Sequence, residues 1–351
     1  MASTLDRRQF LRLAGSVGVV AGLGQAGFVA ASRAAGALTV THFGGPYAVL
    51  ADLIAKPFAA AGLGDVAYEQ DVSTGVIGKM QAGTATFDVA MVSRSPALRA
   101  IKAGLVQPFN PADVPNLAQC IDGVLLENGA GAGYIMDSLD LMVDTNQVSE
   151  PLTSWLDLWR PDLAGKIALP AARVQTQSYL LSMVAIAMGG DYKDDKAIDA
   201  AFAKFAELKP NVRVFYGDPG QASAMIERGE VAVAPQYSIR ISSLMKNNAN
   251  IVRATPKEGV SASPYDLVIA KTAQDPALAA RYIDFALSAE VQKALATEFL
   301  ALPVNKTVEL DADVSAKVMT DASKLQFLDE EYLASKQSDW LTRWEREIQA
   351  A

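Results

Sequence analysis

Strand-like and helix-like segments alternate along this chain, and the alternation restricts its fold more than any other feature. Short apolar runs that read as strands are each followed by a segment with apolar residues at helical spacing. The runs are 38–43, 65–70 and 88–92, and the helical segments are 47–60, 75–82 and 96–103. A β-α-β-α-β order of this kind predicts a mostly parallel sheet with helices covering its faces.

A second alternating series begins near Lys166. Its predicted strands are 166–169, 212–216, 231–234 and 265–270, and its predicted helices are 178–188, 195–208, 221–228 and 276–296. A further helix is predicted near the end of the sequence. It carries Trp340, Trp344 and Ile348 on one face, which is typical of packing against a lobe. The fold class we predict is therefore α/β, with two lobes that are each a mostly parallel sheet flanked by helices.

Two crossings between the lobes are predicted. Residues 134–144 form a long extended segment without a breaker, and the chain returns near 259–266, where 259–263 is expected to be a loop. The crossings predict a lobe 1 that comprises 38–135 plus 264–351, and a lobe 2 that comprises 136–263.

The first 37 residues have the three parts of a cleaved export signal. A charged start with Arg7 and Arg8 precedes an uncharged run rich in Gly, Ala and Val, and a segment of small residues follows. The paired arginines followed by Phe-Leu are similar to a Tat signal. Cleavage after Ala34 and after Ala37 are both compatible with the sequence. An uncleaved membrane anchor is the alternative, although five glycines dilute a run that is at the lower limit of a membrane span. Residues 1–37 are thus predicted to be a Tat-type signal peptide, which places the mature protein in the periplasm.

Composition excludes several classes of function. The formal net charge is -8, so the chain offers no basic patch for nucleic acid and no polybasic cluster for a membrane surface. Its single Cys, Cys120, excludes a disulfide within the chain and the C-x-x-C and iron–sulfur motifs. Its single His, His42, excludes a multi-histidine metal site. The sequence therefore predicts no cofactor and no metal.

One stretch in the middle of the chain points to a known family. Residues 154–167 read SWLDLWRPDLAGKI, which resembles the S-W-x-D-L-W-x-P-x-x-x-G-K-I stretch of bacterial ABC-importer solute-binding proteins of the spermidine/putrescine type. Further matches follow in the expected order, and together they cover nearly all of the chain beyond the signal. They are 208–212, 229–231, 256–259, 280–292 and 301–306.

The resemblance implies a type II periplasmic-binding-protein fold, within extracellular solute-binding protein family 1. Such a protein binds a small-molecule solute in the cleft between its lobes and closes by hinge motion. It implies an ABC permease in the inner membrane as the partner, and a monomer that is not an enzyme. An enzyme on the same scaffold is the alternative of another class, but it would need a nucleophile–base pair or metal ligands, and the chain shows no nucleophile motif. A receptor that presents its liganded form to a sensor stays open as well.

Candidate ligand-binding residues are found by asking which side chains follow the predicted strands, because ligands of open α/β sheets lie beyond the carboxyl ends of strands. These candidates are Phe43, Tyr47, Ser93, Arg94, Arg173, Thr176, Tyr216, Tyr237, Tyr265 and Asp266. For each tyrosine, half-buried packing is the alternative, and for Arg94 and Arg173 it is a surface salt bridge.

The charge of the ligand is predicted from a departure from the family pattern. Polyamine binders of this family need carboxylates in the loop that enters lobe 2 and at the return crossing, since a buried unpaired cation is costly. Here residues 170–177 contain no acid and one arginine, Arg173. Its planar guanidinium suits a carboxylate or phosphonate. We therefore expect an anionic or zwitterionic solute that faces Arg173, although Asp218 and Asp266 offset part of the charge and a spermidine/putrescine-binding protein proper remains the alternative.

Overall fold

The structure is a computed structural model that describes residues 37–319 and 321–350. The predicted signal peptide lies outside the described residues except for Ala37, which begins the first strand. In the described part of the chain, none of the helices has the length and apolarity needed to cross a membrane.

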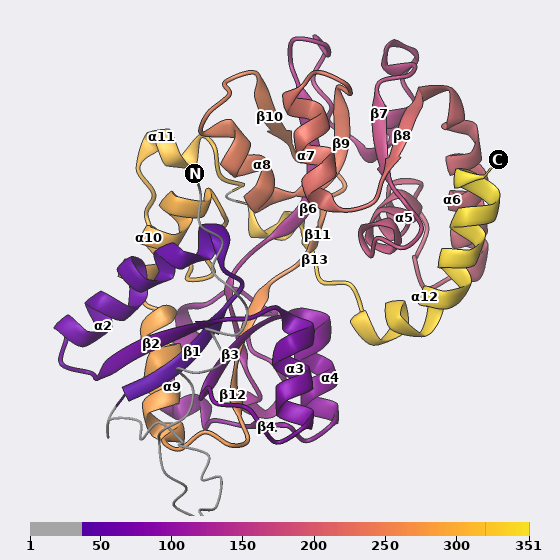
Figure 1. Cartoon of the computed structure of the whole chain (residues 1–351). Coiled ribbons are helices and arrows are strands. Elements are labelled where there is room, and N and C mark those ends of the chain that lie inside the picture. Colours follow the sequence, from indigo (N-terminus) through magenta and orange to yellow (C-terminus); the bar gives the residue numbers. More distant parts are fainter. Residues whose placement is uncertain (1–36, 320, 351) are drawn as a thin grey trace, which may run out of the picture. The chain divides into compact units, whose positions relative to one another are not determined.

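The first sheet has the strand order β2-β1-β3-β12-β4, and β5 also pairs with β12 (Figure 1). Its strands are β1 (Ala37–His42), β2 (Asp65–Gln70), β3 (Val89–Ser93), β4 (Val106–Gln107), β5 (Ala132–Ile135) and β12 (Tyr265–Ala270). The helices that accompany these strands in the chain are α2 (Lys56–Ala60), α3 (Ser73–Gln81), α4 (Arg94–Lys102), α9 (Pro276–Ala286) and α10 (Ala289–Phe299). Strand β3 is central and almost wholly buried, as expected for an apolar run that is covered on both faces.

The second sheet has the order β13-β11-β6-β9-β7-β8, with β10 paired to β6. Its strands are β6 (Ser138–Asp144), β7 (Ile167–Pro170), β8 (Val212–Tyr216), β9 (Val233–Tyr237), β10 (Ile251–Ala254), β11 (Val260–Ala262) and β13 (Leu325–Gln326). The remaining helices are α5 (Thr176–Ala187), α6 (Asp195–Glu207), α7 (Pro219–Glu227), α8 (Ser238–Met245), α11 (Ala312–Ser315) and α12 (Glu330–Trp344).

The α/β class and the two-lobed fold are confirmed, and the strand pairing refines the expectation of mostly parallel sheets. Each sheet keeps parallel neighbours, such as β1 with β2 and β7 with β8, but β12 and β6 run antiparallel to the strands beside them. The reason is that β12 and β6 are the strands by which the chain enters each sheet from the other. The two expected crossings lie at 136–137, between β5 and β6, and at 263–264, between β11 and β12.

Local sequence patterns misplace a few elements. The segment 259–263, expected to be a loop, contains β11, because Ser261 and Ala262 pair with β6. The helix expected over 276–296 is divided into α9 and α10, since the hydroxyl group of Ser288 accepts a hydrogen bond from the backbone of Val291 and starts a new helix there. The helix expected over 47–60 is a succession of 3-10, π and α turns.

The C-terminal segment differs from the sequence-based boundaries. These put all of 264–351 in lobe 1, but β13 pairs in parallel with β11 of the second sheet, so the described chain passes between the sheets a third time. Trp344 of the following helix is fully buried and its indole Nε1 donates to the carbonyl oxygen of Pro170, 3.0 Å away. The ring of Trp344 also lies 4.8 Å from that of Phe205 in α6, which supplies the apolar surface that the tryptophan face of α12 needs.

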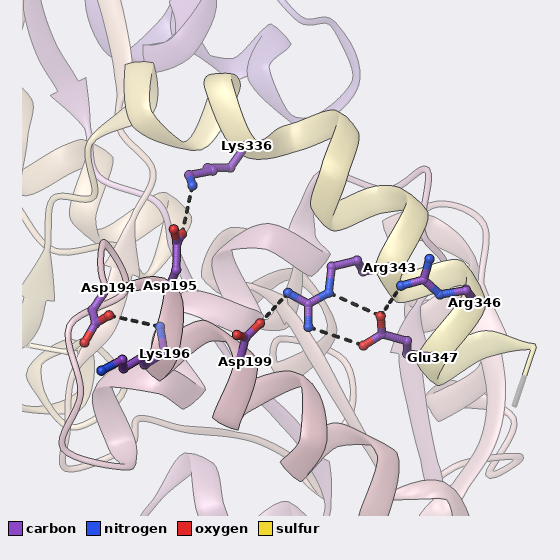
Figure 2. Close-up of polar contacts among 8 residues, drawn as sticks. All are labelled: Asp194, Asp195, Lys196, Asp199, Lys336, Arg343, Arg346 and Glu347. Carbon is purple, nitrogen blue, oxygen red and sulfur yellow. Dashed lines mark hydrogen bonds and ion pairs between the residues drawn. The ribbon is translucent and has the colours of Figure 1, made fainter.

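Charged side chains along α12 reinforce this position (Figure 2). Lys336 pairs with Asp195 at 2.8 Å, and Arg343 pairs with Asp199 at 2.7 Å, and both acids belong to α6. Exposed pairs of this kind add little free energy, so the buried tryptophan face is what fixes the helix.

Candidate functional site

A cavity of about 790 Å³ lies between elements of the two sheets. Phe43 and Tyr47 after β1, Ser93 at the end of β3 and Tyr265 at the start of β12 line it from the first sheet. The crossing at 136–137 and helix α8 line it from the other side. A smaller cavity of about 180 Å³ adjoins it, because both are lined by Ser93, Tyr265 and Arg240. The two together form one cleft.

Three aromatic rings form one wall of the large cavity. Phe43, Tyr47 and Tyr265 contact one another edge to face, with ring centroids 5.1–5.6 Å apart. Such contacts add stability beyond the buried area and hold each ring in a fixed orientation. The wall can therefore receive the apolar part of a solute.

The turn after β1 makes this wall possible. Gly44 has a φ of 75°, a left-handed conformation that favours glycine, and a Cβ atom there would meet the side-chain amide of Gln70 at 2.3 Å. The backbone N–H of Gly44 donates to Nδ1 of His42 at 3.0 Å. The single histidine thus supports the turn that presents Phe43 and Tyr47.

Asp137 is a buried carboxylate at the first crossing, and it lines the large cavity. Its Oδ1 accepts hydrogen bonds from the hydroxyl group of Ser238 (2.7 Å) and from the backbone N–H groups of Ser138 (2.9 Å) and Ile239 (3.1 Å). Its Oδ2 accepts one, from the hydroxyl group of Tyr265 (3.0 Å). Burial raises the pKa of Asp137, and these donors oppose that rise.

Most other charges around the cleft are paired within the protein. Arg94 forms a bidentate ion pair with the fully buried Asp266, with both nitrogen–oxygen distances at 2.8 Å. Burial raises the pKa of Asp266 to about 6, and the charge of Arg94 opposes that rise. Lys246 and Glu298, both at the large cavity, pair with each other at 2.8 Å.

Arg240 is the exception. It lies in the first turn of α8, it is exposed, and it lines both cavities. Within residues 37–319 and 321–350, its guanidinium has no ion pair or hydrogen bond with another side chain. In the same ranges, no group of three or more His, Cys, Asp or Glu side chains is placed to hold a metal ion.

The sequence-predicted residues separate into two sets. The cleft brings together Phe43, Tyr47, Ser93, Arg94, Tyr237 and Tyr265. Arg173, Thr176, Tyr216 and Asp266 do not line either cavity.

Each residue of the second set has a different position. Arg173 is exposed, with its guanidinium beside Gly217, and Thr176 is buried. Tyr216 is fully buried and its hydroxyl group donates to the carbonyl oxygen of Pro235 at 2.9 Å. Asp266 is fully buried in β12 of the first sheet, where it pairs with Arg94.

Sequence reasoning missed Asp137 and Arg240. Asp137 stands in an otherwise apolar stretch, 130–137, and this break in the pattern was the available signal. Arg240 lies in α8, a helix that the sequence analysis did not predict, and nothing local distinguishes it from other arginines.

Comparison with known proteins places the chain in a family. Residues 54–321 match the family model described as bacterial extracellular solute-binding protein. The γ-aminobutyric acid-binding protein of Pseudomonas aeruginosa is 28% identical over 293 residues, which covers 80% of each chain. The range matched by the family model includes strands of both sheets.

Solved structures share the fold. A crystal structure of an ABC transporter from Clostridium perfringens superimposes with a TM-score of 0.76 at 25% identity and covers 89% of this chain and 99% of that one. The spermidine/putrescine ABC transporter substrate-binding protein of Streptococcus pneumoniae gives a TM-score of 0.75 at 19% identity, with the same coverage of 89% and 99%. The chain thus belongs to the bacterial extracellular solute-binding protein family and is a solute-binding receptor of an ABC transporter.

Proposed function

We propose that this receptor binds a small zwitterionic solute, with one ammonium group and one carboxylate, in the cleft between its two sheets. The observation that carries the proposal is the charge balance of the cleft. After the pairs Arg94–Asp266 and Lys246–Glu298 are set aside, one carboxylate and one guanidinium remain among the described lining residues. They are Asp137 and Arg240.

A diamine is a poor match for this cleft. Each ammonium group that loses its water needs a carboxylate, and the second group would face the guanidinium of Arg240 instead. γ-Aminobutyric acid, for which the Pseudomonas aeruginosa relative is named, carries one group of each sign. We therefore favour an amino acid of this kind over spermidine and putrescine.

Further parts of the proposal concern export, lobe boundaries and closure. Residues 1–37 direct export through the Tat route and are removed, and the receptor acts in the periplasm as a monomer without catalytic activity. Lobe 1 comprises 38–135 and 264–324, and lobe 2 comprises 136–263 and 325–350. The ligand shifts the lobes toward a closed form, which the membrane permease recognises.

A thermal-shift screen of the chain from Leu38 onward tests the ligand class, because a ligand that binds only the native state raises the melting temperature. We expect ω-amino acids such as γ-aminobutyric acid to raise it, while putrescine and spermidine leave it unchanged. A shift with polyamines alone would overturn the proposal. Conversion of any bound compound during the assay would favour an enzyme instead.

A further inference from the structure

We propose that Asp137 and Arg240 hold the opposite ends of the solute, and that this pair selects an amino acid whose charged groups are separated by a short apolar chain. The inference rests on the proposed zwitterionic ligand and assigns its two ends to named residues.

Asp137 has room for the ammonium group at one of its two oxygens. Oδ1 already accepts three hydrogen bonds, whereas Oδ2 accepts one, from Tyr265. A carboxylate oxygen has two lone pairs, so Oδ2 can accept a further donor. Since Asp137 lines the large cavity and not the small one, the ammonium end belongs in the large cavity.

Arg240 suits the carboxylate end. Arg240 lines both cavities, and its guanidinium has no protein carboxylate as partner among the described residues. Gln175 and Ser263 line the small cavity with it and add polar groups around a bound carboxylate. A guanidinium binds a carboxylate through two parallel hydrogen bonds, which fixes the direction of the solute.

Helix α8 keeps the two ends at a constant separation. Asp137 accepts hydrogen bonds from Ser238 and Ile239 in the first turn of α8, and Arg240 is the next residue in that helix. Asp137 and Arg240 form no ion pair with each other and both line the large cavity, so each can pair with one end of a solute there. The connecting carbon chain then lies against the aromatic wall of Phe43, Tyr47 and Tyr265.

Calorimetric titration of three arginine variants tests the assignment. We expect Arg240→Ala to weaken γ-aminobutyric acid binding at least 30-fold, because the carboxylate loses its partner. Arg173 is an exposed arginine outside both cavities, so Arg173→Ala is the matched control. This variant should bind γ-aminobutyric acid with an affinity within twofold of that of the parent protein. Arg240→Glu should lose γ-aminobutyric acid and gain putrescine, since the cleft then presents two carboxylates.

Analogues of the ligand test the two ends separately. Asp137→Asn should weaken the binding of γ-aminobutyric acid at least tenfold. Butylamine lacks the carboxylate, so its affinity for Arg240→Ala should equal its affinity for the parent protein. Asp137 also supports α8, so circular dichroism must show that Asp137→Asn is folded. If it is not, the Arg240 variants carry the test, because that exposed side chain has no hydrogen-bond or ion-pair partner among the described residues.

Three results would overturn the inference. They are unchanged binding by Arg240→Ala, loss of binding by Arg173→Ala, and failure of Arg240→Glu to change the preference between the two ligands. These outcomes are distinct from a failure of the proposed function, in which the parent protein itself binds no zwitterion in the thermal-shift screen and both proposals fall.

Discussion

The hydroxyl group of Tyr265 donates a hydrogen bond of 3.0 Å to Oδ2 of Asp137, and this contact joins the first two crossings between the sheets, at 136–137 and 263–264. Asp137 lies in the first crossing, and Tyr265 is the first residue of β12, immediately after the second. Burial and the negative charge of Asp137 raise the pKa of Tyr265 well above its usual value, so the hydroxyl group stays protonated and continues to donate. The bond therefore connects the hinge directly to the cleft lining.

Replacing Tyr265 with Phe removes this donor and keeps the ring. We expect the free energy of unfolding to fall by about 1.5–3 kcal/mol, the range for a hydrogen bond to a charged group. Urea denaturation measures the loss. Tyr332→Phe is the control, since the hydroxyl group of Tyr332 only donates to the carbonyl oxygen of Lys193 in an exposed position. Equal stability of Tyr265→Phe and the parent protein would contradict the role given to this bond.

Ligand binding should depend on pH through Asp137. Burial raises the pKa of Asp137 above the usual 3.8, so the carboxylate takes up a proton at a higher pH than an exposed aspartate does. An ammonium group prefers the ionised carboxylate, so affinity should be highest above the raised pKa and should decline as the pH falls through it.

Asp137 is surrounded by hydrogen-bond donors and lies near other ionisable groups, so the pH series needs a control that removes only its own titration. Its hydrogen-bond donors are Tyr265 from β12, Ser238 and the backbone of Ile239 from α8, and the backbone of Ser138. Asp137 and Arg240 both act on the ionisation of Tyr47. Asp137→Asn removes the titrating group and should flatten the profile measured by calorimetry. An affinity of the parent protein that does not decline as the pH is lowered through the acidic range would argue against Asp137 as the ammonium partner.

The ion pair between Arg94 and Asp266 should be a stabilising contact. Arg94→Met would leave the fully buried carboxylate of Asp266 without its partner, which costs about 3–5 kcal/mol for pairs of this kind. Chemical denaturation checks this, and Arg228→Met, which breaks an exposed pair with Glu230, should leave stability nearly unchanged. Adding Asp266→Leu to Arg94→Met should recover part of the loss, and a further loss would show that the carboxylate was not the source of the penalty.

The C-terminal helix should contribute to the stability of the second sheet. Trp344→Ala removes a fully buried ring and its hydrogen bond to Pro170, for an expected loss of about 3–5 kcal/mol in the free energy of unfolding. Lys336→Ala removes the ion pair with the exposed Asp195 and a cation–π contact with Tyr332, but no buried ring, and serves as the control (Figure 2). If both variants unfold at the same urea concentration, α12 does not pack as described.

Local sequence patterns predicted those helices and strands in which apolar residues recur at a regular spacing. The alternation of apolar runs and helical spacing gave the order of β1, β2 and β3 and their helices, and the tyrosines at strand ends pointed to Tyr47 and Tyr265. The position of α12 was not available in this way, because the spacing of Trp340 and Trp344 shows that a face is buried but not which sheet buries it.

The charges of the cleft required the three-dimensional structure. Arg94 and Asp266 are 172 residues apart, so their pairing is invisible in the sequence. Arg173 was chosen because it was the only charge in its loop, but a loop position does not tell whether a long side chain faces a cavity. An unpaired guanidinium can be identified only after every neighbouring acid has been placed.

Titration calorimetry with two four-carbon ligands tests the central claim most directly. Both ligands have four carbon atoms and one ammonium group, but γ-aminobutyric acid carries a carboxylate after three methylene groups, whereas putrescine carries a second ammonium group after four. The account predicts that the chain from Leu38 onward binds γ-aminobutyric acid at least 100-fold more tightly than putrescine. Equal or tighter binding of putrescine would contradict it.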